Sequence, residues 1–227
     1  MKGRFKSLGL LVLSVVLSCW LVGAAQPTPE VTLETSPTLT TAQKTWFRIG
    51  YAYAEATEED DITELGDMLP GVPPWELLQA LSEWKDDPED QDLKGKVRPL
   101  LATYAKDQAD YLGVEAFRLG EWCSQMEDAL VDFVIGLLTK NEMSIFDSVI
   151  RLRILSEELR LHIDILSSEA PDDVMGALKE IHLNAAKLDI VKIATEPGPI
   201  EERIEEFLDA IMSLPELIDK IKEIFEV

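Results

Sequence analysis

Apolar residues recur every three or four positions along most of the chain, a spacing that places them on one face of an α-helix. The clearest stripes run over residues 119–137 and 145–166, and others run over 46–54, 174–191 and 204–225. No stretch of four or more residues alternates cleanly between apolar and polar side chains, as a half-buried β-strand would. The pattern therefore predicts an all-α protein.

Caps and prolines divide this pattern into separate helices. Three pairs of residues have the spacing of helix N-caps, namely Thr40 with Gln43, Ser144 with Asp147, and Ser213 with Glu216. We expect Pro99 to force a kink or a new helix start, and turns near residues 70–74, 167–171 and 197–199 to end helices. Because amphipathic helices with short connections pack as antiparallel neighbours, we expect residues 42–227 to form one antiparallel bundle of roughly six to eight helices.

Small residues occur at the start of the strongest helical stripe and just before it, at Gly113, Ala116 and Gly120. Such residues let a neighbouring backbone approach closely, and a glycine can equally mark a kink. The sequence leaves both alternatives open.

Aromatic and thiol side chains follow the same stripes. The tryptophans at these positions are Trp46, Trp75, Trp84 and Trp122, and Cys123 lies directly after the last of them. Helical spacing favours core positions for the tryptophans over an exposed aromatic platform. For Cys123 it predicts a buried, unreactive thiol.

The first 25 residues have the three parts of a secretory signal peptide. A basic start with Lys2, Arg4 and Lys6 precedes an apolar centre, and small residues close the segment at 23–25. We expect cleavage to leave Ala25 or Gln26 as the first mature residue. The body of the protein would then be extracytoplasmic, either periplasmic or secreted.

Two other interpretations of this segment stay open. The uncharged run over residues 7–29 is long enough to span a bilayer as an uncleaved anchor. The sequence Val16-Leu17-Ser18-Cys19 resembles a bacterial lipobox, in which Cys19 is lipidated. All three interpretations place the body outside the cytoplasm, and membrane contact is expected only through an uncleaved or lipidated N-terminal segment. Residues 26–41, with three prolines and six threonines, are expected to form a flexible tether.

Charge narrows the choice of partner. The chain has 43 acidic and 21 basic residues and a formal net charge of −22. A nucleic-acid partner is not expected, because phosphate backbones are bound by lysine and arginine. A solvated acidic surface is the favoured interpretation over a specific acidic docking site. The basic residues of the segment 94–98 either dock a partner's acids or offset the acids of 86–92, and we favour the second.

The sequence lacks the residue motifs that many catalytic and cofactor-binding sites require. The two cysteines form no C-x-x-C pair, which excludes a disulfide framework, a zinc-finger array and a haem-attachment motif. There is no G-x-S-x-G nucleophile motif, and loops starting at Asp60 or Asp86 do not fit the EF-hand pattern. We therefore expect neither an enzyme nor a bound cofactor.

One metal site has candidate ligands in Glu158, His162 and His182. Glu158 and His162 are four residues apart and share a helix face. If the next turn centres near residue 170, His182 comes level with Glu158 on the antiparallel neighbour. A carboxylate with two imidazoles suits zinc or iron. The spacing differs from the Glu-x-x-His motif of helical di-metal sites, and His162 shares its side with several leucines, so we expect no metal.

Taken together, the sequence predicts an exported, acidic, non-enzymatic helical module that binds a protein or polymer partner in the cell envelope. The alternative is a periplasmic helical bundle that binds a small ligand or a metal.

Overall fold

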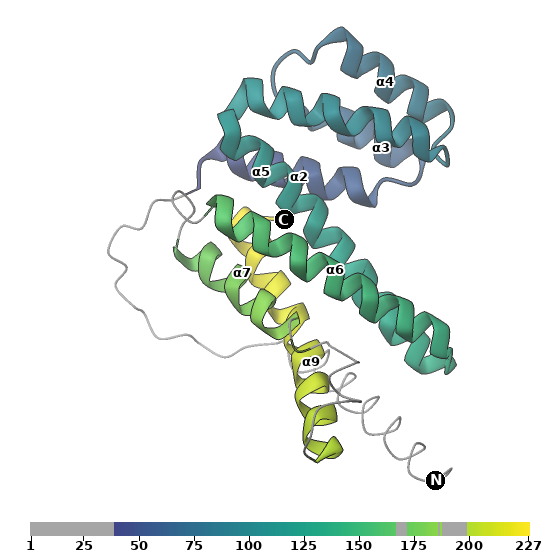
Figure 1. The fold of residues 1–227 in the computed structure, drawn as a ribbon. Helices are drawn as coiled ribbons and strands as arrows, with labels where there is room; N and C mark the ends of the chain where they lie inside the picture. Colours follow the sequence, from purple (N-terminus) through teal and green to yellow (C-terminus); the bar gives the residue numbers. More distant parts are fainter. Residues whose placement is uncertain (1–38, 167–171, 186, 188–198) are drawn as a thin grey trace.

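The computed structural model describes residues 39–166, 172–185, 187 and 199–227. All regular structure within these residues is helical, which confirms the predicted all-α class (Figure 1). The seven helices are α2 (Thr41–Glu55), α3 (Glu59–Asp67), α4 (Trp75–Asp86), α5 (Gln91–Thr139), α6 (Glu142–Leu166), α7 (Asp172–Ala185) and α9 (Ile200–Phe225). The expected leader, residues 26–38 of the tether, the turn at 167–171 and the stripe from 188 to 191 lie outside the described residues.

The longest helix, α5, changes direction in its middle. Ala109 and Asp110 leave helical geometry, and Asp110 has a φ of 56°, a conformation that residues other than glycine rarely adopt. The second half of α5 starts close to the first and then diverges from it (Figure 1), and a salt bridge from Arg98 to Glu121, with an N–O distance of 2.7 Å, joins the two halves. Of the two alternatives for Pro99, a new helix start is wrong, because the backbone stays helical there. The carbonyl that Pro99 cannot satisfy belongs to the exposed Gly95, where water can take its place.

Helix α2 packs against α5 so closely that only glycine fits at the crossing. A Cβ atom added to Gly50 would lie 1.9 Å from the carbonyl oxygen of Phe117, and one added to Gly120 would lie 2.0 Å from that of Phe47. The close approach that was one alternative for Gly120 is therefore confirmed. Gly113 packs beside the bend, where an added Cβ would lie 2.6 Å from the Cβ of Ala109.

The C-terminal helices close the bundle. Helix α6 runs back along the second half of α5, with the Trp122 indole N–H donating to the carbonyl oxygen of Leu155 at 2.8 Å. Helix α7 packs on α6 and α9 packs on α7. The end of α9 returns to α2, where Phe225 stacks on Phe47 with ring centroids 4.0 Å apart. Within the described residues, no helix is long and apolar enough to cross a membrane.

Two predicted caps are wrong, and each has a local reason. Helix α6 begins two residues before Ser144, because the side-chain oxygen of Asn141 accepts the Ser144 backbone N–H. Helix α9 continues through Pro215, and the Ser213 hydroxyl donates to the carbonyl oxygen of Ala210 instead of capping a new helix. Buried apolar residues on both sides of Pro215 hold α9 together. The capping box of Thr40 and Gln43 is confirmed.

The core contains most of the predicted apolar residues. Trp46, Trp84 and Trp122 are buried, whereas Trp75 is 74% exposed, so its predicted core position is wrong. Trp75 lies at the first residue of α4, on the side away from the buried Leu77 and Leu81. The largest buried side chains are Trp46, Phe47, Ile49, Ile62, Leu65, Leu77, Trp84, Leu101, Phe117, Leu119, Met126 and Leu152.

Cys123 is a free, fully buried cysteine, as expected. Burial raises the pKa of its thiol, since the thiolate would lose its hydration, and the proximity of Glu127 adds to the effect. The thiol is therefore held in its protonated, weakly nucleophilic form.

We predict that Gly120→Ala lowers the free energy of unfolding by an amount at the upper end of about 1–3 kcal/mol, because its methyl group would displace the backbone of α2. Urea denaturation measures the change. The matched control is Gly95→Ala, an exposed position in the same helix where an added Cβ meets no atom within 4 Å. We expect that control to stabilise the protein by about 0.5–1 kcal/mol. Equal effects of the two substitutions would contradict the close crossing.

Candidate functional site

The structure places His182 away from the other two proposed metal ligands, Glu158 and His162. His182 does lie opposite α6, but its Nδ1 is 3.0 Å from the carbonyl oxygen and 3.3 Å from the hydroxyl of Ser156. His182 was expected to lie opposite Glu158, but the residue that it contacts, Ser156, is two positions earlier in α6. Two residues correspond to about 200° around a helix, so Glu158 belongs to another face and is exposed.

His162 has a partner that the sequence did not indicate. Its Nδ1 lies 3.1 Å from one carboxylate oxygen of Glu115, and Arg118 donates to the other oxygen at 2.8 Å. Glu115 is completely buried in α5. A signal was present in the sequence, since Glu115 and Arg118 are three residues apart and therefore neighbours on one helix face.

A second buried carboxylate, Glu121, lies six residues further along α5. Both oxygens of Glu121 accept hydrogen bonds from Arg98, at 2.7 and 3.0 Å. The hydrogen bonds that Arg98 donates to Glu121 raise the pKa of Arg98, and the nearby Glu158 of α6 adds to this effect. We call the six residues Glu115, Arg118, Glu121, Arg98, Glu158 and His162 the polar cluster.

The two buried glutamates respond to this environment in opposite directions. Burial acts to raise the pKa of Glu115, but the hydrogen bond from His162 and the charge of Arg118 outweigh it and hold the pKa below its usual range. Burial raises the pKa of Glu121, and Arg98 offsets only part of that rise. A buried carboxylate is tolerated when cations and donors satisfy it. The polar cluster therefore fastens the two halves of α5 to each other and to α6.

The basic segment at residues 94–98 also has a structural role, different from the one we favoured. The Lys94 ammonium donates to the carbonyl oxygens of Ala54 and Ala56 at 2.9 and 3.0 Å, at the C-terminal end of α2. It lies over the rings of Tyr53 and Trp84 as well. These contacts, together with the pairing of Arg98 to Glu121, direct the two cations away from the acids of residues 86–92.

The described residues add no new candidate metal site. Within the described residues, no group of three or more histidine, cysteine, aspartate or glutamate side chains is placed to hold a metal ion. The metal content of the protein stays a prediction to be measured.

The outer face of α6 is apolar, although the described residues do not cover it. Five large apolar side chains lie along it, each between 41% and 67% exposed, and we call them the outer stripe: Met143, Phe146, Ile150, Ile154 and Leu161. The opposite face of the same helix is buried through Leu152, Leu155 and Leu159. Helix α6 is thus apolar on two opposite faces, of which the described residues cover one.

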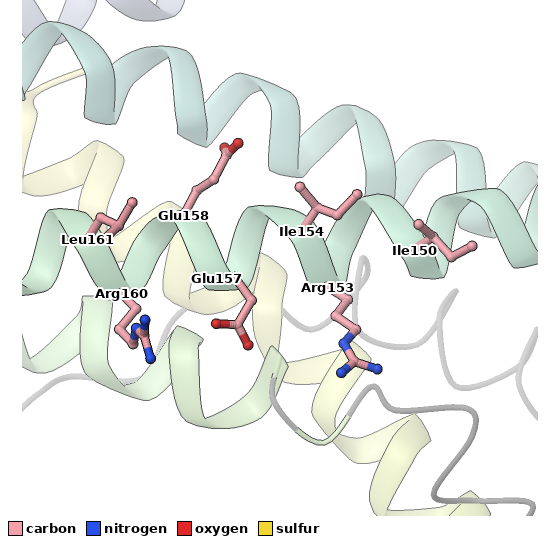
Figure 2. Close-up of a pocket in the computed structure, with 7 residues that line it drawn as sticks. All are labelled: Ile150, Arg153, Ile154, Glu157, Glu158, Arg160 and Leu161. Carbon is pink, nitrogen blue, oxygen red and sulfur yellow. The ribbon is translucent and has the colours of Figure 1, made fainter.

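A shallow pocket with a volume of about 410 Å³ follows this outer face (Figure 2). Its lining combines three residues of the outer stripe with charged neighbours: Ile150, Arg153, Ile154, Glu157, Glu158, Arg160 and Leu161. Figure 2 shows Glu158 pointing toward α5 and Glu157 and Arg160 pointing to the other side of the stripe. The arrangement is an apolar strip with charged edges.

A smaller exposed patch begins α4. It consists of Val72, Trp75 and Leu78, the first two being the most exposed large apolar residues among those described. Three residues around a proline-rich turn offer less contiguous surface than the outer stripe, which extends over 19 residues of helix, or about 27 Å. The outer stripe is therefore the stronger candidate for a binding surface.

Comparison of the chain with protein families, with curated proteins and with solved structures finds no match.

We predict that Glu115→Gln lowers the free energy of unfolding by about 1–3 kcal/mol at neutral pH, because a charged hydrogen-bond acceptor is lost. The pKa of Glu115 is lowered on folding, so its carboxylate stabilises the folded state above the usual glutamate pKa. That contribution is lost as the pH falls through the lower, folded value.

Denaturation curves of both proteins between pH 7 and pH 3 test the sign. The difference in free energy of unfolding should shrink toward low pH. The exposed Glu180→Gln serves as the control and should change little at any pH. A difference between the native protein and Glu115→Gln that is independent of pH would show that Glu115 is not held as a carboxylate by its neighbours.

Proposed function

We propose that this protein is a non-enzymatic interaction module of the cell envelope that binds a partner through the outer stripe of α6. The observation that carries the proposal is the second apolar face of that helix, opposite its buried face. Contiguous exposed apolar surface with a polar border is typical of protein-binding sites. The buried carboxylates of the polar cluster support the same conclusion, since their cations engage them in structural pairs.

The sequence of the first 25 residues supports the location. Its basic start, apolar centre and small-residue end are those of an export signal. An acidic net charge of −22 fits a body that is kept off anionic membrane surfaces.

Intact-mass measurement on protein isolated from its own host tests this location. We expect a mature chain that begins at Ala25 or Gln26. A mass that retains residues 1–25 would contradict cleavage and favour the anchor. A diacylglycerol adduct on Cys19 would show a lipoprotein instead.

Site-specific photo-crosslinking in the host tests the interaction. A photoreactive amino acid replaces Ile154 in the full-length protein, where the side chain lies at the centre of the outer stripe. We expect a discrete crosslinked product from this position, because a bound partner would cover it.

Two matched positions make the result specific. Leu183 is 64% exposed and belongs to a different helix, α7, and Trp75 belongs to the smaller patch on α4. Neither should give the product. Equal crosslinking from all three positions would mean non-specific contact, and a product from Trp75 alone would move the binding surface to α4.

A further inference from the structure

The shape of the outer stripe matches a helix laid alongside α6. Its five apolar residues follow one another at intervals of three, four, four and seven positions. These intervals make a straight line along a helix, of the kind that packs against the apolar face of a second helix. The required partner surface is therefore a narrow apolar strip about 27 Å long, which an amphipathic helix provides.

Charge further defines that helix. Glu157 is exposed and lies between Ile154 and Leu161, so a helix that covers both residues must also pass over or beside this carboxylate (Figure 2). Arg160 is exposed on the same side of the stripe. A carboxylate enclosed by an apolar contact is tolerated only if a cation or donor of the partner faces it.

A second copy of this chain fits poorly. In an antiparallel pair that places Ile150 opposite Ile154, Glu157 comes level with Asp147 of the other copy. In a parallel pair Glu157 faces its own counterpart, and the favourable contact of Arg153 with Glu158 at the edge is an exposed one of small value. Both pairs would also bring together two bodies that each have a net charge of −22.

An anionic membrane surface fits poorly for the same reason. Helices that lie on such surfaces have lysine and arginine along their polar face. Here Glu157 and Glu158 line the pocket together with Arg153 and Arg160, so the charges at the edges of the stripe are mixed.

We infer that the occupant of the outer stripe is an amphipathic helix of another protein, with a lysine or arginine at the border of its apolar strip where it meets Glu157 and acidic residues along the same border where it meets Arg160. This inference rests on the proposed function and specifies the partner. Glu157 then determines which helices can bind to the outer stripe. A partner without the matching cation would leave this carboxylate desolvated and unpaired.

Charge reversal at Glu157 tests the inference. The full-length protein with the photoreactive residue at Ile154 is compared with the same protein that also contains Glu157→Lys. We expect the yield of crosslinked product to fall by at least about tenfold, because like charges would then face each other at the contact. The control Glu180→Lys makes the same charge change at an exposed position of α7 and should leave the yield unchanged. Circular dichroism melts should show that both variants are folded.

Mass spectrometry of the product identifies the crosslinked segment. We expect a segment with apolar residues at intervals of three and four and a lysine or arginine beside them. Replacing that cation with glutamate should restore crosslinking to the Glu157→Lys protein, which a structural role of Glu157 alone would not produce.

The remaining outcomes overturn the inference in different ways. A product of twice the mass of the chain would identify a second copy as the occupant. A lipid adduct whose yield rises with Glu157→Lys would identify an anionic membrane surface. A protein product that Glu157→Lys leaves unchanged would remove the charge assignment while keeping the proposed function. No product from Ile154 at all would refute the proposed function itself.

Discussion

The contact between the backbones of α2 and α5 is the constraint on which the rest of the bundle depends. At Gly50 and Gly120 the two helices leave no room for a Cβ atom, so their separation is fixed by main-chain atoms rather than by interchangeable side chains. Phe47, whose carbonyl oxygen faces Gly120, also stacks on Phe225 at the end of α9. The crossing thus positions α2, the second half of α5 and the end of α9 together, and side-chain packing fills the space that this leaves.

The polar cluster adds a second, directional constraint to this apolar framework. Apolar contacts allow a helix to slide or rotate at little cost, whereas the two oxygens of a buried carboxylate accept hydrogen bonds only in defined directions. Glu115 binds His162 of α6 in this way, which fixes the rotation of α6 against α5. Glu121 binds Arg98 within α5, which holds the two halves of that helix together. With α6 held at this angle, the buried leucines face the core and the outer stripe must face outward.

The sequence predicts where the helices lie better than it predicts where they bend or end, for a physical reason. Helical stripes and the capping box at Thr40 depend on near neighbours, which the sequence lists directly. The helical path through Pro99 and Pro215 and the bend at Ala109 and Asp110 depend on packing across the bundle, which local rules do not contain. The buried pairing of Glu115 with His162 likewise joins residues of different helices. Only the spacing of Glu115 and Arg118 was visible in the sequence.

The outer stripe shows how an exposed apolar surface can be missed when the apolar positions of a helix are assigned to the core. The buried stripe of α6 was predicted from Val149, Leu152, Leu155 and Leu159, and its identification accounted for the helix as an ordinary amphipathic one. Ile150 and Ile154 share that segment but lie about half a turn away from Leu152. One apolar face of α6 packs against the core of the protein. The opposite apolar face is exposed, and we propose that it packs against a partner. In a strongly acidic chain, the row of large exposed apolar residues along α6 is a feature that core packing does not explain. For that reason the proposal that α6 binds a partner is based on this second face and not on a buried polar group.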